Sequence, residues 1–414
     1  MNKRNLSLLL AIIAGEAIFM LPFLIPRLYR PLMIETWNLT NTDIGLAFSA
    51  YGLSAMISYI IGGPLADKYH QRILMASSLA LTSIGGFALI YFHSAANLIF
   101  IYFMFGISTT LLMWGALIKL THQIGGENNR ASAMGLLDAG RGLSAAIMSS
   151  VIIFAIAFFV DESNSDSNSA SLSLTYGLVA CFNLAVAVLL IYGLKGLSFT
   201  ASSSSKWSLK ESIEVLKRLD VWLLGIIILS SYCGYKSVDN YSIYLVDVLN
   251  FDLKESSHFT SLIFWLRPIS AFIAGFAADY VGRKIKGGRF LNLFVLLIVA
   301  SLLQFAMTTG IQSLTSLILF IVLISSSLAY ALRAIYFAVF GDLNIPSHLV
   351  GTTVGIVSLV GFLPDMFFGT LTGYLIDNNE GAVGYNYVFM FTGTAMLIGS
   401  ACSLYCYFRS KRIN

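Results

Sequence analysis

The chain has 414 residues, of which 57% are hydrophobic and only 11% are charged. Soluble domains carry about 25% charged residues, so this composition excludes an ordinary soluble protein and indicates an integral membrane protein. The formal net charge of +4 gives no reason to expect a nucleic-acid partner, because the positions of Lys and Arg follow from membrane topology.

Apolar stretches of about 20 residues recur along the chain, and each is long enough to cross a hydrocarbon core of about 30 Å as a helix. We predict twelve spans, at residues 7–30, 42–64, 73–93, 97–119, 132–159, 173–194, 221–249, 257–280, 289–310, 314–338, 350–372 and 385–408. The predicted fold class is an all-α membrane protein with twelve transmembrane helices in two pseudo-symmetric six-helix bundles.

Residues 195–220 separate the sixth and seventh spans and combine a Ser-rich stretch with a basic amphipathic segment. Such a composition is typical of a linker or a surface helix. We therefore predict an N-terminal bundle at 1–194, a cytoplasmic linker at 195–220 and a C-terminal bundle at 221–414.

A short loop motif occurs once in each half, as GGPLADKYHQR at 62–72 and as GFAADYVGRK at 275–284. In each copy a Gly, Gly63 or Gly275, stands four residues before an Asp and is expected to let two helices approach closely. The Asp can then bond to helix ends or to basic side chains. An ordinary tight cytoplasmic turn is the alternative, but two copies favour an internal repeat, as in many secondary transporters.

With both loop motifs and its twelve spans, the chain resembles the major facilitator superfamily over its whole length. The resemblance implies two bundles that rock about a central cavity, with these loops stabilising the outward-open state. The residues to which it gives this gating role are Asp67, Arg72, Asp279 and Arg283. The pattern departs from the family at His70 and Gln71, where a Gly is usual, and at Tyr280, where a basic residue is usual.

The basic residues also predict the orientation. If both termini are cytoplasmic, 17 of the 25 Lys and Arg residues lie inside, and only Lys254 lies in an outer loop. The positive-inside rule therefore predicts a multi-pass protein of the inner (plasma) membrane with cytoplasmic termini.

Ionisable residues within the spans are candidates for function, because an unpaired charge in hydrocarbon is costly. The cations are Arg27, Arg30, Lys119, Arg141, Lys236, Arg267 and Arg333, and the acids are Glu16, Asp138, Asp239 and Asp365. Two couples, Asp138 with Arg141 and Lys236 with Asp239, have i,i+3 spacing and can neutralise one another. The remaining surplus of cations favours an anionic ligand.

These residues receive different expected roles. Substrate contacts are expected from Arg27, Lys119, Lys236, Arg333, Tyr235 and Tyr241, proton or ion coupling from Glu16, Asp239 and Asp365, and gating or structural roles from Asp138, Arg141 and Arg267. We further expect that substrate or a proton breaks the Lys236–Asp239 pair. Structural alternatives stay open: Arg30 can snorkel to the interface, Lys119 can anchor the inner end of its span, and Arg267 can bond carbonyls freed by Pro268.

Three segments resemble one branch of the superfamily, the organophosphate:phosphate antiporters for glycerol-3-phosphate and hexose phosphates, and most of all its uncharacterised bacterial members. They are WGALIK at 114–119, YKSVDNYSIYLVDVLNF at 235–251 and GTTVGIVSLVGFLPDMFFGTLTGYLID at 351–377. The branch usually has Arg where this chain offers Lys236, and Lys lacks the planar fork that binds phosphate. Asp239 would also oppose a phosphate, so a carboxylate, a sugar acid or a zwitterion remains open.

We therefore expect a secondary active transporter of a small anionic or polar metabolite, not an enzyme. The expected partners are this small molecule, a proton or counter-anion and the lipid bilayer, and we expect a monomer with no cofactor or metal. The sequence contains no GxxxxGK phosphate loop, which argues against ATP-driven transport. The alternatives are a ligand sensor of the same fold and a proton-coupled symporter of a zwitterionic or neutral nutrient; the surplus of cations argues against multidrug efflux.

Overall fold

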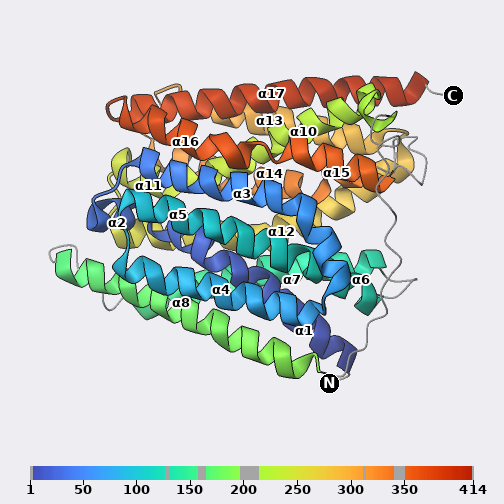
Figure 1. The fold of residues 1–414 in the computed structure, drawn as a ribbon. Coiled ribbons are helices and arrows are strands. Elements are labelled where there is room, and N and C mark those ends of the chain that lie inside the picture. Colours follow the sequence, from blue (N-terminus) through green and yellow to red (C-terminus); the bar gives the residue numbers. More distant parts are fainter. Residues whose placement is uncertain are drawn as a thin grey trace. The chain divides into compact units, whose positions relative to one another are not determined.

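The computed structural model describes residues 3–125, 130–156, 165–195, 214–310, 314–339 and 350–412, and every regular element within these ranges is a helix (Figure 1). The chain divides into two compact units. The first consists of Met1–Ser204, Asn250–Trp265 and Gly369–Gly373, and the second of Ser205–Leu249, Leu266–Phe368 and Tyr374–Asn414.

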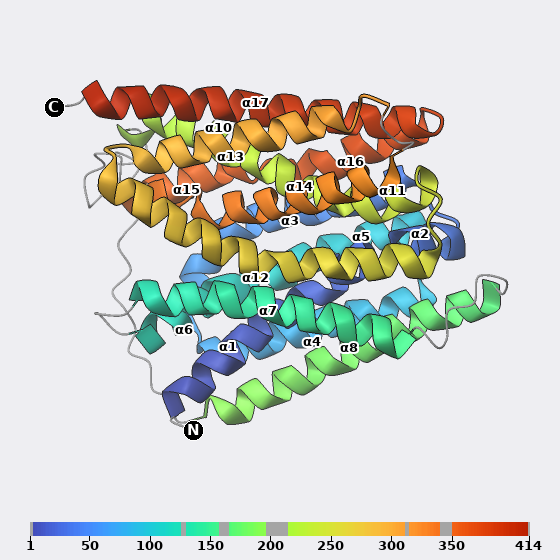
Figure 2. The ribbon, with the colours of Figure 1, turned by 180° about the vertical axis from the view of Figure 1, so that it is seen from behind.

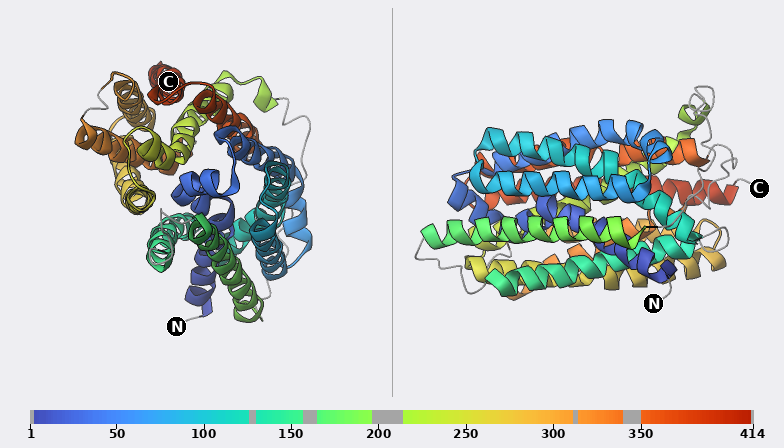
Figure 3. Two further views of the ribbon diagram at one scale, coloured as in Figure 1. Left: turned by 90° about the vertical axis from the view of Figure 1, so that its left-hand side faces the viewer. Right: turned by 60° about the horizontal axis from the view of Figure 1, so that its bottom comes forward.

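The first unit contains most of the elements of the N-terminal half. They are α1 (Lys3–Phe19), η1 (Met20–Leu24), α2 (Ile25–Trp37), α3 (Asn41–Lys68), α4 (Gln71–Tyr91), α5 (Ala95–Gly106), η2 (Ile107–Trp114), α6 (Gly115–Gly125), α7 (Arg130–Ile156) and α8 (Ser165–Gly193). The η1 and η2 segments are π-helical. Within this unit α8 packs along α4 (Figures 1 and 3).

The second unit contains the elements that follow. They are α10 (Leu219–Ser237), the 3₁₀ turn η3 (Val238–Asn240), α11 (Tyr241–Asp247), α12 (Leu253–Lys284), α13 (Gly288–Ala306), α14 (Thr315–Ile335), α15 (Val350–Gly361), α16 (Pro364–Asp377) and α17 (Ala382–Arg412). Parts of α12 and α16 belong to the first unit. In the second unit α17 runs beside α13 and α10 (Figure 2).

Eleven helical stretches among the described residues are long and apolar enough to cross a membrane, and each coincides with one predicted span. The other predicted span, 42–64, lies within α3, a helix of 28 residues that is not among these eleven. The prediction of an all-helical membrane protein is confirmed, and the number of spans is consistent with twelve.

The first span is not the simple helix over 7–30 that its apolar run predicts. The chain passes from α1 through the π-helical turn η1, which contains Pro22, and continues in α2 as far as Trp37. Pro31 lies inside α2, where a ring without an N–H disturbs the helix, and Tyr29 has non-helical angles of φ −125° and ψ 24°. The predicted end at residue 30 is therefore seven residues short.

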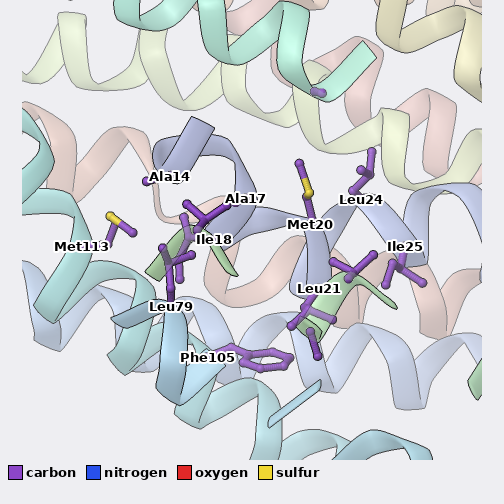
Figure 4. Close-up of a cluster of buried hydrophobic side chains, with 14 of the residues drawn as sticks. Ala14, Ala17, Ile18, Met20, Leu21, Leu24, Ile25, Leu79, Phe105 and Met113 are labelled. Atoms are coloured by element: carbon purple, nitrogen blue, oxygen red, sulfur yellow. The ribbon is translucent and has the colours of Figure 1, made fainter. Parts of the chain in front are cut away.

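Small side chains allow the helices of the first unit to pack closely. Ala14 and Ala17 of α1 are fully buried, and side chains from α4, α5 and η2 converge on this stretch (Figure 4). Close approach through small residues is the usual way in which membrane helices associate, because lipid gives no hydrophobic force between them.

In each unit the first and last helices meet at one end. A Cβ added to Gly193, at the end of α8, would lie 2.5 Å from the Leu10 side chain of α1, so these two helices approach closely there. In the second unit Arg409 near the end of α17 lies 3.9 Å from Asp220 at the start of α10. A bundle that crosses the membrane an even number of times has this arrangement.

Gly106 gives a test of the packing between α5 and α3. A Cβ atom at this position would overlap the Tyr51 carbonyl oxygen and the Ser54 hydroxyl, whereas a Cβ at Gly135 of α7 would meet nothing within 4 Å. We expect Gly106→Ala to lower stability by about 1–3 kcal/mol through overpacking, measured as thermal unfolding of the purified protein in detergent. Gly135→Ala is the control and should leave the melting temperature unchanged or slightly raised. Equal melting temperatures for the two variants would contradict this packing.

Candidate functional site

The second unit contains a buried charged cluster where its first helix is interrupted. Lys236 lies in the last turn of α10, and Asp239 lies in the 3₁₀ turn η3 that separates α10 from α11. The predicted continuous helix over 221–249 is thus wrong at this point. A stretch of 3₁₀ helix in the middle of a span often marks a functional hinge.

Lys236 is held between two carboxylates. Its Nζ lies 2.8 Å from Oδ2 of Asp239 and 3.6 Å from Oδ1 of Asp365 on α16. The side chains of Lys236 and Asp239 are 2% and 5% exposed, whereas that of Asp365 is 20% exposed. The predicted pair of Lys236 and Asp239 forms, and the structure adds Asp365 to it.

The Tyr232 hydroxyl connects α10 to α16. It lies 3.0 Å from both carboxylate oxygens of Asp365 and can donate its hydrogen to either one. The positive charges of Lys236 and Arg333 and the negative charge of Asp239 also act on this carboxylate. Lys236 and Asp239, which sequence analysis placed in one span, therefore form one electrostatic cluster with Asp365 and Arg333, which it placed in two other spans.

Aromatic rings line the cluster. The guanidinium carbon of Arg333 lies 4.2 Å from the centre of the Tyr235 ring, a cation–π contact. The Tyr235 ring in turn lies 5.5 Å from Tyr232 and 6.1 Å from Tyr330, and Phe362 lies 5.0 Å from Tyr232. Arg333 is half-buried on α14, so it is positioned by a ring and is still accessible.

Tyr241, a predicted substrate contact, has a different environment. Its hydroxyl accepts a hydrogen bond from Nε2 of Gln304 at 3.1 Å and lies 3.5 Å from the Ser237 hydroxyl. Its ring packs against Phe389 of α17, and the residue is only 1% exposed. These contacts favour a structural role in joining α11 to α13 and α17.

The first unit has its own buried cation, Arg141 on α7. Its Nε lies 3.3 Å from Glu16 and donates to the Gly15 carbonyl at 3.0 Å, and its NH1 lies 3.4 Å from Asp138. The guanidinium is also 5.3 Å and 5.4 Å from two aromatic ring centres, those of Phe19 and Trp114. The predicted pair of Asp138 and Arg141 forms, but Arg141 additionally binds Glu16, which sequence analysis assigned to coupling.

The other cations of the first unit have separate contacts. Arg27 is 6% exposed and lies over the Phe23 ring at 5.7 Å. Arg30 is 2% exposed, and its NH2 lies 3.5 Å from the Asn41 carbonyl oxygen. Lys119 donates to the Ala66 carbonyl at 3.1 Å. Burial of Arg30 argues against the alternative in which it snorkels to the membrane interface.

The two loop motifs are described to different extents. The surroundings of Gly63 and the side chain of Asp67 lie outside the described part of the chain. Arg72 is half-buried near the start of α4. Asp279 lies 3.5 Å from Arg289 at the start of α13, which agrees with a bond to a basic side chain.

One reason given for the second motif is wrong. A Cβ at Gly275 would meet nothing within 4 Å, so this glycine does not bring two helices together in this structure. Arg283 is exposed, and Lys284 donates to the Tyr280 hydroxyl at 2.5 Å.

Arg267 is half-buried inside α12, immediately before Pro268, and α12 continues unbroken to Lys284. Among the described residues, no group of three or more His, Cys, Asp or Glu side chains could hold a metal ion. All four cysteines are free thiols.

Sequence analysis missed the link between α10 and α16. Tyr232 and Asp365 are 133 residues apart, and no local spacing relates them. The one available signal was that Asp365 follows Pro364 in a span that contains no other predicted charge, which marked the residue without indicating its partner.

Comparison with known proteins supports the membrane-transport interpretation. The family model described as Major Facilitator Superfamily matches residues 7–369. The Inner membrane protein YqcE of Escherichia coli (strain K12) is 25% identical over 387 residues, which cover 92% of this chain and 90% of that protein. The Hexuronate transporter of Bacillus subtilis (strain 168) is 24% identical over 363 residues, 84% of this chain and 82% of that protein.

Solved structures agree in fold. A bacterial homolog of the human lysosomal transporter Spinster, in an inward-facing and unoccupied conformation, gives a TM-score of 0.74 at 15% identity and covers 100% of this chain and 98% of that chain. The nucleoside transporter NupG gives a TM-score of 0.72 at 12% identity, with 98% of this chain and 99% of that chain covered.

The buried pair can be tested by stability. Lys236→Met leaves Asp239 and Asp365 without their shared cation, and we expect a loss of about 3–5 kcal/mol in stability, because removing one member of a buried ion pair strands the other. The double variant Lys236→Met/Asp239→Asn should recover most of this loss.

Thermal unfolding of the purified protein measures both changes, with Lys254→Met, at an exposed position, as the control. If the single and double variants had the same melting temperature, there would be no energetic coupling between Lys236 and Asp239.

Proposed function

Because this chain belongs to the Major Facilitator Superfamily, we propose that it is a secondary transporter that carries a small organic anion, specifically a sugar acid, across the inner membrane by alternating access. The chain is a multi-pass membrane transporter and not an enzyme. The observation that carries the proposal is the cluster in which Arg333 lies over the Tyr235 ring and acts on the Asp365 carboxylate, with further aromatic rings beside it.

A sugar acid has three kinds of group, and the cluster offers a partner for each. Arg333 can place its planar N–H fork against a carboxylate while Tyr235 supports its face. Asp365 accepts hydrogen bonds, and sugar hydroxyls donate them. The mostly buried rings of Tyr232 and Tyr235 would form the apolar wall next to Arg333 against which the C–H face of a sugar ring rests.

A phosphate ester suits this cluster less well. Lys236 already forms ion pairs with Asp239 and Asp365. A doubly charged phosphate ester would therefore be repelled by these two carboxylates. We therefore favour a carboxylate substrate over those of the organophosphate:phosphate antiporter branch. The B. subtilis relative is named Hexuronate transporter, which supports this choice.

The location follows from the family and the charge pattern. Two similar E. coli proteins, YqcE and YihN, are named inner membrane proteins. With the asymmetric distribution of Lys and Arg in the sequence, we propose the inner membrane with both termini in the cytoplasm. The domain boundaries proposed from the sequence are 1–194, 195–220 and 221–414.

Ligand binding tests the proposal directly. A ligand that binds only the native state raises its apparent stability, by about 2.7 kcal/mol at a hundred times its Kd. We expect glucuronate to raise the melting temperature of the purified protein more than glucose or glucose 6-phosphate does. Arg333→Gln should abolish this rise, measured against the melting temperature of the same variant without ligand, because the change removes the guanidinium and leaves Tyr235 in place.

The matched control is Arg283→Gln, which changes an exposed Arg near the end of α12 and should retain the shift. An equal shift in Arg333→Gln would exclude Arg333 from the site. Uptake of labelled glucuronate into proteoliposomes then separates transport from sensing, since a sensor would bind glucuronate and carry none.

A further inference from the structure

Lys236 has two acidic partners that differ in distance and exposure. Asp239 is 2.8 Å away and 5% exposed, whereas Asp365 is 3.6 Å away and 20% exposed. If Asp239 took up a proton, the buried Lys236 would lose the shorter of these two ion pairs. If Asp365 took up a proton, Lys236 would keep the shorter one, so Asp365 is the carboxylate that can change its charge without stranding a buried cation.

Among the described charged groups that act on Asp365, positive and negative charges are equal in number before any substrate binds. The groups that act on it are Lys236 and Tyr232 from α10, Asp239 from η3 and Arg333 from α14. Lys236 and Arg333 carry two positive charges, and Asp239 and Asp365 carry two negative charges. A substrate anion added to this set leaves one uncompensated negative charge in a mostly buried place, which is costly.

We propose that Asp365 binds one proton together with each substrate anion, so that the transporter carries a proton and a singly charged anion in the same direction. The inference rests on the proposed function and adds its coupling ion. With the proton on Asp365 the cluster has one net positive charge, and one monovalent anion restores neutrality. A doubly charged anion would not be balanced, which makes charge a determinant of specificity.

Tyr232 is suited to hold Asp365 in both protonation states. Its hydroxyl lies 3.0 Å from each carboxylate oxygen. A phenol can donate to an ionised carboxylate and can also accept from a protonated one. Tyr232 is therefore a positioning residue. Its ring packs at a tilt against that of Tyr235, which lies under Arg333, so Asp365 and Arg333 are held by neighbouring rings.

The test is glucuronate uptake by the wild-type protein in proteoliposomes. Symport of one proton with one monovalent anion is electroneutral, so a pH gradient of about one unit, acid outside, should sustain about tenfold accumulation, because tenfold in either concentration is worth 1.4 kcal/mol. A membrane potential set with potassium and valinomycin should not change this ratio.

Asp365→Asn should lose the accumulation driven by the pH gradient, because the amide cannot take up the proton, whereas Asp365→Glu, which keeps a titratable carboxyl, should retain part of it. Asp377→Asn, at an exposed carboxylate on the same helix, should accumulate like the wild type. Tyr232→Phe should move the pH profile of transport to higher pH, because the lost hydroxyl donated a hydrogen bond to the ionised carboxylate.

The outcomes separate the two proposals. No glucuronate uptake by the wild type would overturn the proposed function and the proton site together. Uptake that ignores the pH gradient, or tenfold accumulation by Asp365→Asn, would overturn the proton site alone. If Asp365→Asn fails to fold, the wild-type response to potential and the pH profile of Tyr232→Phe still decide, and an unmoved profile counts against Asp365.

Discussion

A lysine ammonium removed from water must keep a negative partner, and the second unit is organised around this requirement at Lys236. Its two partners, Asp239 and Asp365, come from different segments, so the same ion pairs that satisfy the charge also join α10 and η3 to α16. The 3₁₀ turn at η3 places Asp239 close enough for the shorter pair. Because buried charges are costly to strand, any change in one carboxylate must be compensated by the other or by a ligand.

The first unit solves a similar problem differently. Arg141 is also shared by two acids, Glu16 and Asp138, but its guanidinium lies near two aromatic rings and bonds a backbone carbonyl as well. With this many contacts Arg141 is well suited to a structural role. In the second unit the cation shared by two acids and the cation that lies over an aromatic ring are different residues, Lys236 and Arg333.

The fold could be predicted from the sequence, because membrane spans are recognised by the length and low polarity of their apolar stretches. The sequence was also sufficient for pairs three residues apart, such as Lys236 with Asp239, since helical spacing alone brings them together. It was insufficient where contacts join distant helices: Asp365 with Tyr232, Glu16 with Arg141 and Gln304 with Tyr241 have no local pattern. The role of Gly275 failed for the same reason, because only the neighbouring helices determine whether a glycine is closely packed.

Asp365 is proposed to take up one proton when the cluster binds one anion. Titration calorimetry of glucuronate binding in buffers with different ionisation enthalpies counts the protons taken up, provided that Asp365 is ionised before ligand is added. The account predicts an uptake of about one proton per anion for the wild type, because charge balance requires one, and none for Asp365→Asn. Binding of glucuronate by the wild type with no proton uptake at any pH would contradict it.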